Sequence, residues 1–131
     1  MSETDAGDVE YFPLPGKTQL PFSAAVRVGN ILYVSGQMGT VDGGLQVAPG
    51  GIEAETRQTL ANMKAILERH GSSLDRIIKC TVMMADMSEW PAMNAIYVRH
   101  FPANLPARSA FGAAALALGG RVEIECIATV G

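Results

Sequence analysis

Residues 77–84 read Ile-Ile-Lys-Cys-Thr-Val-Met-Met, a β-rich apolar run. Strict alternation divides them between two faces of a strand: Ile78, Cys80, Val82 and Met84 on one, and Ile77, Lys79, Thr81 and Met83 on the other. The second face is still half apolar. A strand of this kind is typical of the centre of a sheet that is covered on both sides, so both faces of the predicted sheet need a packing partner.

Two amphipathic helices are predicted, one before and one after this strand. The first covers residues 52–70, and Gly71 ends it. Its apolar side chains recur at helical spacing, at Leu60, Met63, Ile66 and Leu67. The second helix is predicted to be capped by Ser88, with Pro91 tolerated in its first turn. Its expected buried stripe consists of Trp90, Met93, Tyr97 and Phe101.

The N-terminal half predicts a β-hairpin ahead of the first helix. Residues 22–28 and 31–35 flank Gly29-Asn30, a dipeptide suited to a tight hairpin turn. Residues 36–51 are rich in glycine and are predicted to be a loop, with one short strand near residues 45–47.

The C-terminal part predicts a second hairpin, formed by residues 108–116 and 121–130 around Gly119-Gly120. The order is then hairpin, helix, strand, helix, hairpin. This order is that of an α+β fold in which two helices pack on one face of a mixed β-sheet. No second layer remains within the chain for the other face, and we therefore assign that face to neighbouring subunits.

Length and composition agree with a single oligomeric domain. The 131 residues suit one domain. Residues 1–10 are polar and acidic and are expected to form a disordered tail, whereas residues 11–131 form the domain. Hydrophobic residues make up 48% of the chain and charged ones only 18%. Some apolar surface should therefore face a partner chain, for which a homo-oligomer is the simplest explanation.

Charge and hydropathy narrow the class of protein. The net charge is −3 and the basic residues are scattered, which argues against a nucleic-acid partner. The N-terminus lacks the basic and apolar regions of a signal peptide. No uninterrupted apolar stretch reaches the ~18 residues of a membrane span. We therefore expect a cytoplasmic protein with no membrane partner.

The sequence lacks the motifs of several chemistries. It has no G-x-S-x-G elbow, P-loop, dinucleotide fingerprint or paired Cys/His set. Cys80 and Cys126 lie in apolar runs, so buried free thiols are expected. His70 and His100 lie near predicted helix ends, where histidine often contacts the terminal carbonyl groups. No metal and no other cofactor is expected.

Two charged residues stand in apolar strands. The planar fork of Arg108 matches a carboxylate, so this side chain is either paired internally or free for an anionic ligand. Glu123 shares a strand face with Glu125 and on composition alone is an ordinary solvated residue. With a tight turn at Gly119-Gly120, Glu123 would lie opposite residues 115–116, far from Arg108. Either a bulge and a longer loop intervene, or the two groups meet across a subunit boundary.

Several motifs together point to one family. Residues 105–109 (Leu-Pro-Ala-Arg-Ser) and 121–128 (Arg-Val-Glu-Ile-Glu-Cys-Ile-Ala) resemble the closing signature of the RidA/YjgF proteins, formerly also called endoribonuclease L-PSP. Residues 34–37 (Val-Ser-Gly-Gln) resemble the second strand and turn of this family. Residues 55–62 are similar to its first helix and residues 93–97 to its second. The match runs from about Pro21 to Ala128.

This resemblance implies a chorismate-mutase-like α+β fold, a homotrimer, and small-molecule clefts between adjacent subunits. It implies hydrolysis of reactive imines and enamines, such as 2-aminoacrylate, to 2-keto acids and ammonia, so the partner is a small carboxylate-bearing metabolite. By position, Arg108 would grip the substrate carboxylate and Glu123 would orient or activate the attacking water. The cleft would also contain Phe22, Ser35, Gly36, Asn94 and Ala110.

The chain also departs from the pattern of the family. Phe22 stands where active members usually carry a tyrosine, so a hydroxyl is missing, and residues 110–113 (Ala-Phe-Gly-Ala) make the cleft less polar. A non-catalytic module that binds small carboxylates or a protein partner on the same scaffold therefore stays open. A ribonuclease, suggested by the older family name, is disfavoured by the net charge of −3.

Overall fold

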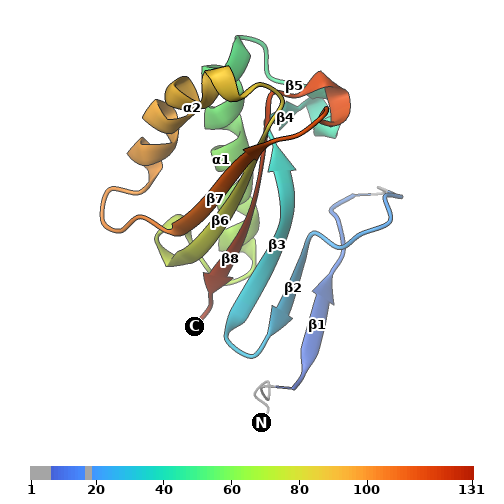
Figure 1. Cartoon of the computed structure of the whole chain (residues 1–131). Coiled ribbons are helices and arrows are strands. Elements are labelled where there is room, and N and C mark those ends of the chain that lie inside the picture. Colours follow the sequence, from blue (N-terminus) through green and yellow to red (C-terminus); the bar gives the residue numbers. More distant parts are fainter. Residues whose placement is uncertain (1–6, 17–18) are drawn as a thin grey trace.

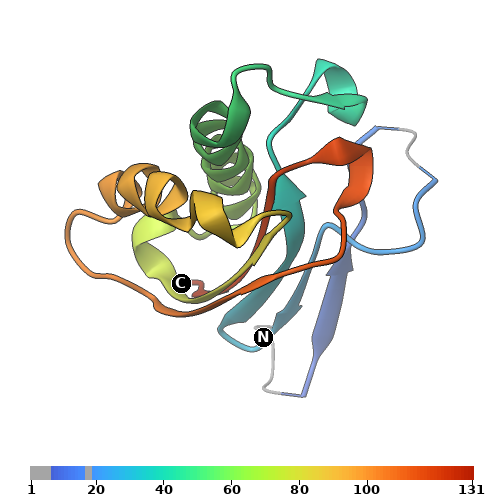
Figure 2. The same cartoon turned by 45° about the horizontal axis from the view of Figure 1, so that its top comes forward.

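One six-stranded mixed sheet forms the body of the protein, and two helices pack on one of its faces (Figure 1, Figure 2). The structure is a computed structural model and describes residues 7–16 and 19–131. The strands and helices are, in chain order, β1 (Val9–Phe12), β2 (Ala25–Val28), β3 (Ile31–Met38), β4 (Thr40–Val41), β5 (Gln46–Val47), α1 (Gly51–Arg69), β6 (Ile77–Met84), α2 (Trp90–Tyr97), β7 (Ala107–Gly112) and β8 (Val122–Thr129). The predicted α+β fold, with both helices on one face, is confirmed.

The last strand of the chain lies in the middle of the sheet. The strand order is β1-β2-β3-β8-β6-β7, and all neighbours are antiparallel except β6 and β7. The parallel pair arises because β6, α2 and β7 form a β-α-β crossover. The predicted second hairpin is therefore wrong. Residues 107–112 pair with β6, and residues 113–121 lead the chain back to the centre of the sheet.

The first hairpin is confirmed, with Val28 opposite Ile31 across the turn. Its second strand, β3, is longer than predicted and contains a β-bulge where it pairs with β8. The short strand β5 is confirmed as well. Of the predicted tail, residues 1–6 lie outside the described residues. Val9 and Glu10 belong to β1 instead, because they pair with β2.

The core lies between α1 and the sheet. Leu60, Met63 and Leu67 of α1 are fully buried against the inner strands, where Val82 and Ile124 are also fully buried. This confirms the first predicted helix and its apolar stripe. The two cysteines stand opposite each other on β6 and β8 and are buried free thiols, as predicted.

Two local predictions are wrong. A bulge between Ile77 and Lys79 reverses the expected alternation, so that Ile77 is buried and Ile78 is 47% exposed. Ser88 does not cap α2. Instead, the carboxylate of Asp86 accepts a hydrogen bond of 2.9 Å from the backbone N–H of Ser88 and starts a 3-10 turn that leads into the helix.

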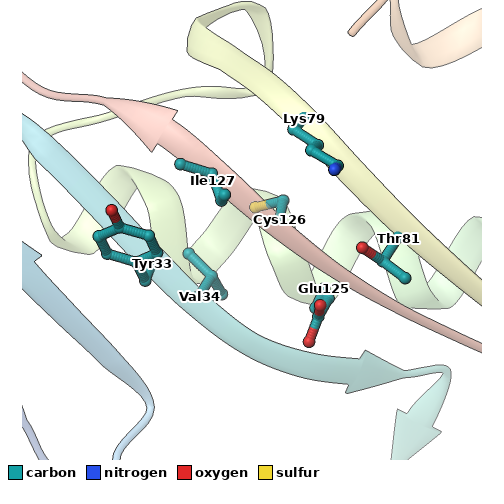
Figure 3. A pocket seen from close by; sticks show the side chains of 7 residues that line it. All are labelled: Tyr33, Val34, Lys79, Thr81, Glu125, Cys126 and Ile127. Carbon is teal, nitrogen blue, oxygen red and sulfur yellow. The ribbon is translucent and has the colours of Figure 1, made fainter. Parts of the chain in front are cut away.

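The face of the sheet away from the helices, called the open face below, is half apolar. Figure 3 looks onto part of it, where a pocket of about 230 Å³ is lined by Tyr33, Val34, Lys79, Thr81, Glu125, Cys126 and Ile127. Nothing in the described part of the chain forms a second layer over this face. This agrees with the expectation from the sequence, which assigns the face to neighbouring subunits. Among the described residues, no helix has the length and hydropathy to span a membrane.

Candidate active site

Arg108 lies on β7 and faces the helix-covered side of the sheet. It stands beside Cys80, whose side chain is fully buried on that side. Its guanidinium carbon lies 4.8 Å from the ring centre of Tyr97 and 5.8 Å from that of Trp90, so two aromatic rings hold the cation by cation–π contact. Within the described part of the chain, Arg108 has no ion-pair partner. The internal ion pair is therefore excluded there, and the fork is free for a carboxylate.

A pocket of about 250 Å³ opens beside this cation. It is lined by Asn94, Tyr97, Val98, Leu105, Pro106 and Arg108. Two buried atoms, Asn94 Oδ1 and the Tyr97 hydroxyl oxygen, lack a hydrogen-bond partner among the described residues. Burial, and then the Cys80 thiol, raise the pKa of Tyr97, which keeps the phenol neutral. An unpaired acceptor beside an unpaired cation suits a ligand that has both a carboxylate and an N–H group.

Glu123 lies on β8 and faces the other way, onto the open face. In the sheet it stands between Met38 of β3 and Met83 of β6. Burial, and then the charge of Glu125, raise the pKa of Glu123 above its ordinary value of 4.5. Because a general base is most effective when its pKa approaches the working pH, this environment favours Glu123 as a base.

Gly36 lies directly against this carboxylate. A Cβ at position 36 would overlap the carboxylate oxygen Oε2 of Glu123, so glycine leaves the room that the carboxylate occupies. The glycine falls within the bulge between Val34 and Gln37, where the register of β3 against β8 shifts. The bulge therefore brings the backbone of β3 into contact with the side chain of Glu123.

Ser35 precedes Gly36 in the same bulge of β3. The hydroxyl of Ser35 donates a hydrogen bond of 2.6 Å to the carbonyl of Ser23, which ties the bulge to the segment that carries Phe22. The side chain of Phe22 is half exposed. The structure thus brings Ser35, Gly36 and Glu123 together, with Phe22 connected to them through its neighbour Ser23.

The predicted site residues form two groups on opposite sides of the sheet. Arg108 and Asn94 share the pocket on the helix-covered side, and Ala110 follows on β7 beside buried Val82. Gly36 and Glu123 lie on the open face. Within one chain the sheet stands between the guanidinium and the carboxylate, so the chain alone does not bring them together.

The model of the family described as Endoribonuclease L-PSP matches residues 16–130. The chain belongs to this family. Two curated relatives, from goat (Capra hircus) and mouse (Mus musculus), are both named 2-iminobutanoate/2-iminopropanoate deaminase. The goat protein is 42% identical over 85% of this chain and 81% of its own length, and the mouse protein is 43% identical over 85% and 82%. The structure of RidA from a Psychrobacter species superposes with a TM-score of 0.81 at 34% identity, covering 96% of this chain and 99% of that one. These matches confirm the RidA/YjgF resemblance.

In this L-PSP family member, sequence reasoning missed the aromatic support of Arg108. The sequence predicts Trp90 and Tyr97 in a buried stripe, but Trp90 is 39% exposed and its ring faces the guanidinium. The spacing along the helix could have predicted this support. Positions 90, 94 and 97 fall on one side of a helix, so they present two rings and the Asn94 amide to the same neighbour. Among the described residues, no group of three His, Cys, Asp or Glu side chains could hold a metal ion.

Proposed function

We propose that this protein hydrolyses reactive 2-imino and enamino acids, such as 2-aminoacrylate, to 2-keto acids and ammonia at clefts between the subunits of a homotrimer. The observation that carries the proposal is the guanidinium of Arg108, which has no ion-pair partner in the described part of the chain and lies in a pocket of metabolite size. The names of the goat and mouse relatives support the type of reaction.

Arg108 would bind the substrate carboxylate through two parallel N–H···O hydrogen bonds. The rings of Trp90 and Tyr97 hold the guanidinium without using its N–H donors, because a cation–π contact engages the face of the ring. Asn94 Oδ1, which is buried and has no hydrogen-bond partner among residues 7–16 and 19–131, would accept a hydrogen bond from the imine N–H. This pair of contacts fits a 2-imino acid, in which the carboxylate and the imine nitrogen sit on neighbouring carbons.

Glu123 would act on the attacking water. The water oxygen bonds to the imine carbon while its proton passes to Glu123, and the C=N bond becomes a single bond. Glu123 returns this proton to the nitrogen, which gives a carbinolamine. The hydroxyl group of the carbinolamine then passes its proton to the amine, so that the C–N bond breaks, ammonia leaves and the C=O bond forms. An enamine first takes a proton at its terminal carbon and loses one from its nitrogen, and so becomes the imine. An imine is already electrophilic, so one positioned base, which typically contributes about 10²–10⁴-fold, is a useful catalyst.

A second subunit would complete the site, because the sheet separates Arg108 from Glu123. The open face supports such an assembly: it is half apolar, and Tyr33 and Phe111 are both 48% exposed on it. A neighbouring chain on this face could bring its Arg108 pocket to the glutamate. The number three rests on the family resemblance. The cytoplasmic location and the lack of a nucleic-acid partner are likewise proposals from the sequence.

The direct test is an assay of imine loss. The purified protein is coupled to a PLP-dependent dehydratase or an amino-acid oxidase, which releases the imine. We expect the parent to accelerate imine loss, and Arg108→Ala to lose about 100-fold in kcat/KM, since charge-assisted hydrogen bonds contribute ~1.5–3 kcal/mol each. Arg99→Ala, at an exposed arginine outside the pocket lining, is the matched control. An inactive parent, or an Arg108→Ala protein as fast as the parent, would refute the proposal.

A carboxylate-binding module without catalysis is the second candidate, because the residues that line the Arg108 pocket include a cation but no base. It requires that 2-keto acids raise the melting temperature of the parent and leave that of Arg108→Ala unchanged, with no turnover. RNA cleavage that disappears in Glu123→Gln would instead favour the activity in the family description, which the net charge of −3 disfavours.

A further inference from the structure

Glu55 of α1 is only 4% exposed, an unusual place for a carboxylate. Its oxygen Oε1 accepts a hydrogen bond of 2.8 Å from the backbone N–H of Arg121. Arg121 directly precedes β8, and Glu123 follows two residues later. The buried carboxylate therefore holds the start of the strand that carries the proposed base.

Arg121 is held at two further points. Its carbonyl oxygen accepts a hydrogen bond of 3.1 Å from the backbone N–H of Ala85, just after β6. Its side-chain Nε donates a hydrogen bond of 2.7 Å to Glu89, which immediately precedes α2. The helix α1, the end of β6 and the start of α2 thus all converge on the residue that leads into β8.

The same part of α1 also fixes the end of β3. A Cβ at Gly39 would lie 2.5 Å from the carbonyl oxygen of Glu55, so the strand end packs directly on the helix backbone. Two helical turns further on, Asn62 Nδ2 donates a hydrogen bond of 2.9 Å to the carbonyl of Met38. α1 therefore anchors both strands whose contact forms the glutamate side of the site.

We propose that Glu55 is a positioning residue for the reaction, and that its hydrogen bond to Arg121 sets where Glu123 stands against Gly36. A role in stability alone explains the arrangement less well. Burying a carboxylate costs more than burying an apolar side chain of similar size, whereas a hydrogen bond at the entry to β8 fixes a position. The catalytic part of this inference rests on the proposed function.

The test compares substitutions that separate the hydrogen bond from the charge. Glu55→Ala removes the acceptor, whereas Glu55→Gln keeps an oxygen there and removes only the charge. Glu53→Gln, at an exposed position of the same helix, is the matched control. In the imine assay we expect Glu55→Ala to lower kcat about 10-fold, with KM changed by less than about 2-fold because Glu55 is not among the residues that line the Arg108 pocket. Glu55→Gln and Glu53→Gln should stay near the parent.

A second readout does not depend on turnover. The Glu123 carboxyl is titrated by ¹³C NMR in the parent and in the variants. In Glu55→Ala the raised pKa of Glu123 should fall, because the Glu123 carboxylate is held less firmly and becomes better hydrated. In Glu55→Gln this pKa should stay unchanged. This measurement tests the positioning even if the parent proves to have no deaminase activity.

Two outcomes would overturn the proposal. One is a folded Glu55→Ala protein with parental kcat and a parental Glu123 titration. The other is an equal loss in Glu55→Ala and Glu55→Gln, which would assign the effect to charge rather than to the hydrogen bond. If Glu55→Ala does not fold, Glu55→Asp takes its place in the test. The shorter side chain keeps the charge but moves the acceptor oxygen away from the Arg121 N–H by one methylene group. Its kcat should fall several-fold, and parental behaviour would equally refute the positioning role.

Discussion

The guanidinium of Arg108 and the carboxylate of Glu123 lie on opposite faces of one β-sheet. Arg108 stands beside buried Cys80 on the helix-covered side. Glu123 alternates along β8 with Val122 and Ile124, which are fully buried on that side, and so points onto the open face. A site that uses both groups has to take Arg108 from one chain and Glu123 from another.

Two inactive variants should therefore restore activity when they assemble together. An Arg108→Ala oligomer lacks the cation at every interface, and a Glu123→Gln oligomer lacks the base at every interface. In mixed rings, an interface that joins the intact arginine of one chain to the intact glutamate of the next arises in about one case in four, so about a quarter of the parental activity should return. Imine loss is measured after the two proteins are denatured and refolded together.

The control for this experiment is the double variant Arg108→Ala/Glu123→Gln, refolded with either single variant. Such mixtures contain no intact interface and should stay inactive. Native mass spectrometry reports whether the subunits have exchanged. Mixed oligomers without recovered activity would show that the two groups do not act across one interface.

Gly36→Ala should impair catalysis more than it impairs folding. The added Cβ would overlap the carboxylate of Glu123, which can rotate away because it is the end of a flexible side chain. We expect kcat to fall by about 10-fold or more, with a change in the free energy of unfolding of less than about 1 kcal/mol. Gly7→Ala is the control, since no atom of the described residues lies within 4 Å of a Cβ at that position. Parental kcat in Gly36→Ala would argue against the Glu123 carboxylate acting from its observed position.

The pH dependence of activity should follow the raised pKa of Glu123. As a base Glu123 has to be ionised, so kcat/KM should fall as the pH is lowered through a value above the ordinary 4.5. Glu123→Gln should lose about 10²–10⁴-fold in kcat and lack this titration. A pH–rate profile of both proteins, corrected for uncatalysed imine hydrolysis, checks this. A parental profile in Glu123→Gln would assign the titration to another group.

The same group makes a prediction for stability. Because the folded-state pKa of Glu123 lies above the unfolded value, the folded state binds the proton more tightly. This contribution to stability is complete below pH 4.5 and is lost as the pH rises through the folded-state pKa. Denaturant unfolding across this range should show a smaller fall in Glu123→Gln than in the parent. An identical fall in both proteins would show that Glu123 is not its source.

Local patterns in the sequence carried the prediction of the helices and of the first hairpin. The first helix, predicted over residues 52–70, is observed over Gly51–Arg69. This prediction succeeds because its evidence is local: apolar residues recur with the 3.6-residue period of a helix, and Gly71 marks the end. Arg108 could also be singled out, as a cation in an apolar run. That its guanidinium has no ion-pair partner among the described residues could not be predicted, because such an absence depends on tertiary contacts.

The misplaced strand has a different cause. Residues 107–112 and β8 follow each other in sequence, and sequential strands usually pair, but the crossover through α2 places β7 beside β6 instead. The bulges could not be predicted from the sequence either. Each bulge shifts by one residue the alternation of side chains between the two faces of the sheet. One bulge exchanges the faces of Ile77 and Ile78, and another, between Val34 and Gln37, creates the contact between Gly36 and Glu123.

Assembly through the open face makes one further prediction. Tyr33 is 48% exposed in the single chain and lines the pocket on this face, beside Ile127 of the central strand. Tyr33→Asp adds a charge that a solvated face tolerates but that a buried interface does not, since an unpaired buried charge costs several kcal/mol. We therefore expect subunit affinity to weaken by about 100-fold or more, with activity lost as the chains dissociate.

Light scattering and the imine assay over a dilution series measure both effects. Leu45→Asp is the matched control, because Leu45 is 79% exposed and lies outside the six-stranded sheet. This variant should keep the parental mass and the parental activity. A Tyr33→Asp protein that retains the mass of the parent at low concentration would place the subunit interface elsewhere. It would then leave the carboxylate of Glu123 without a neighbouring Arg108.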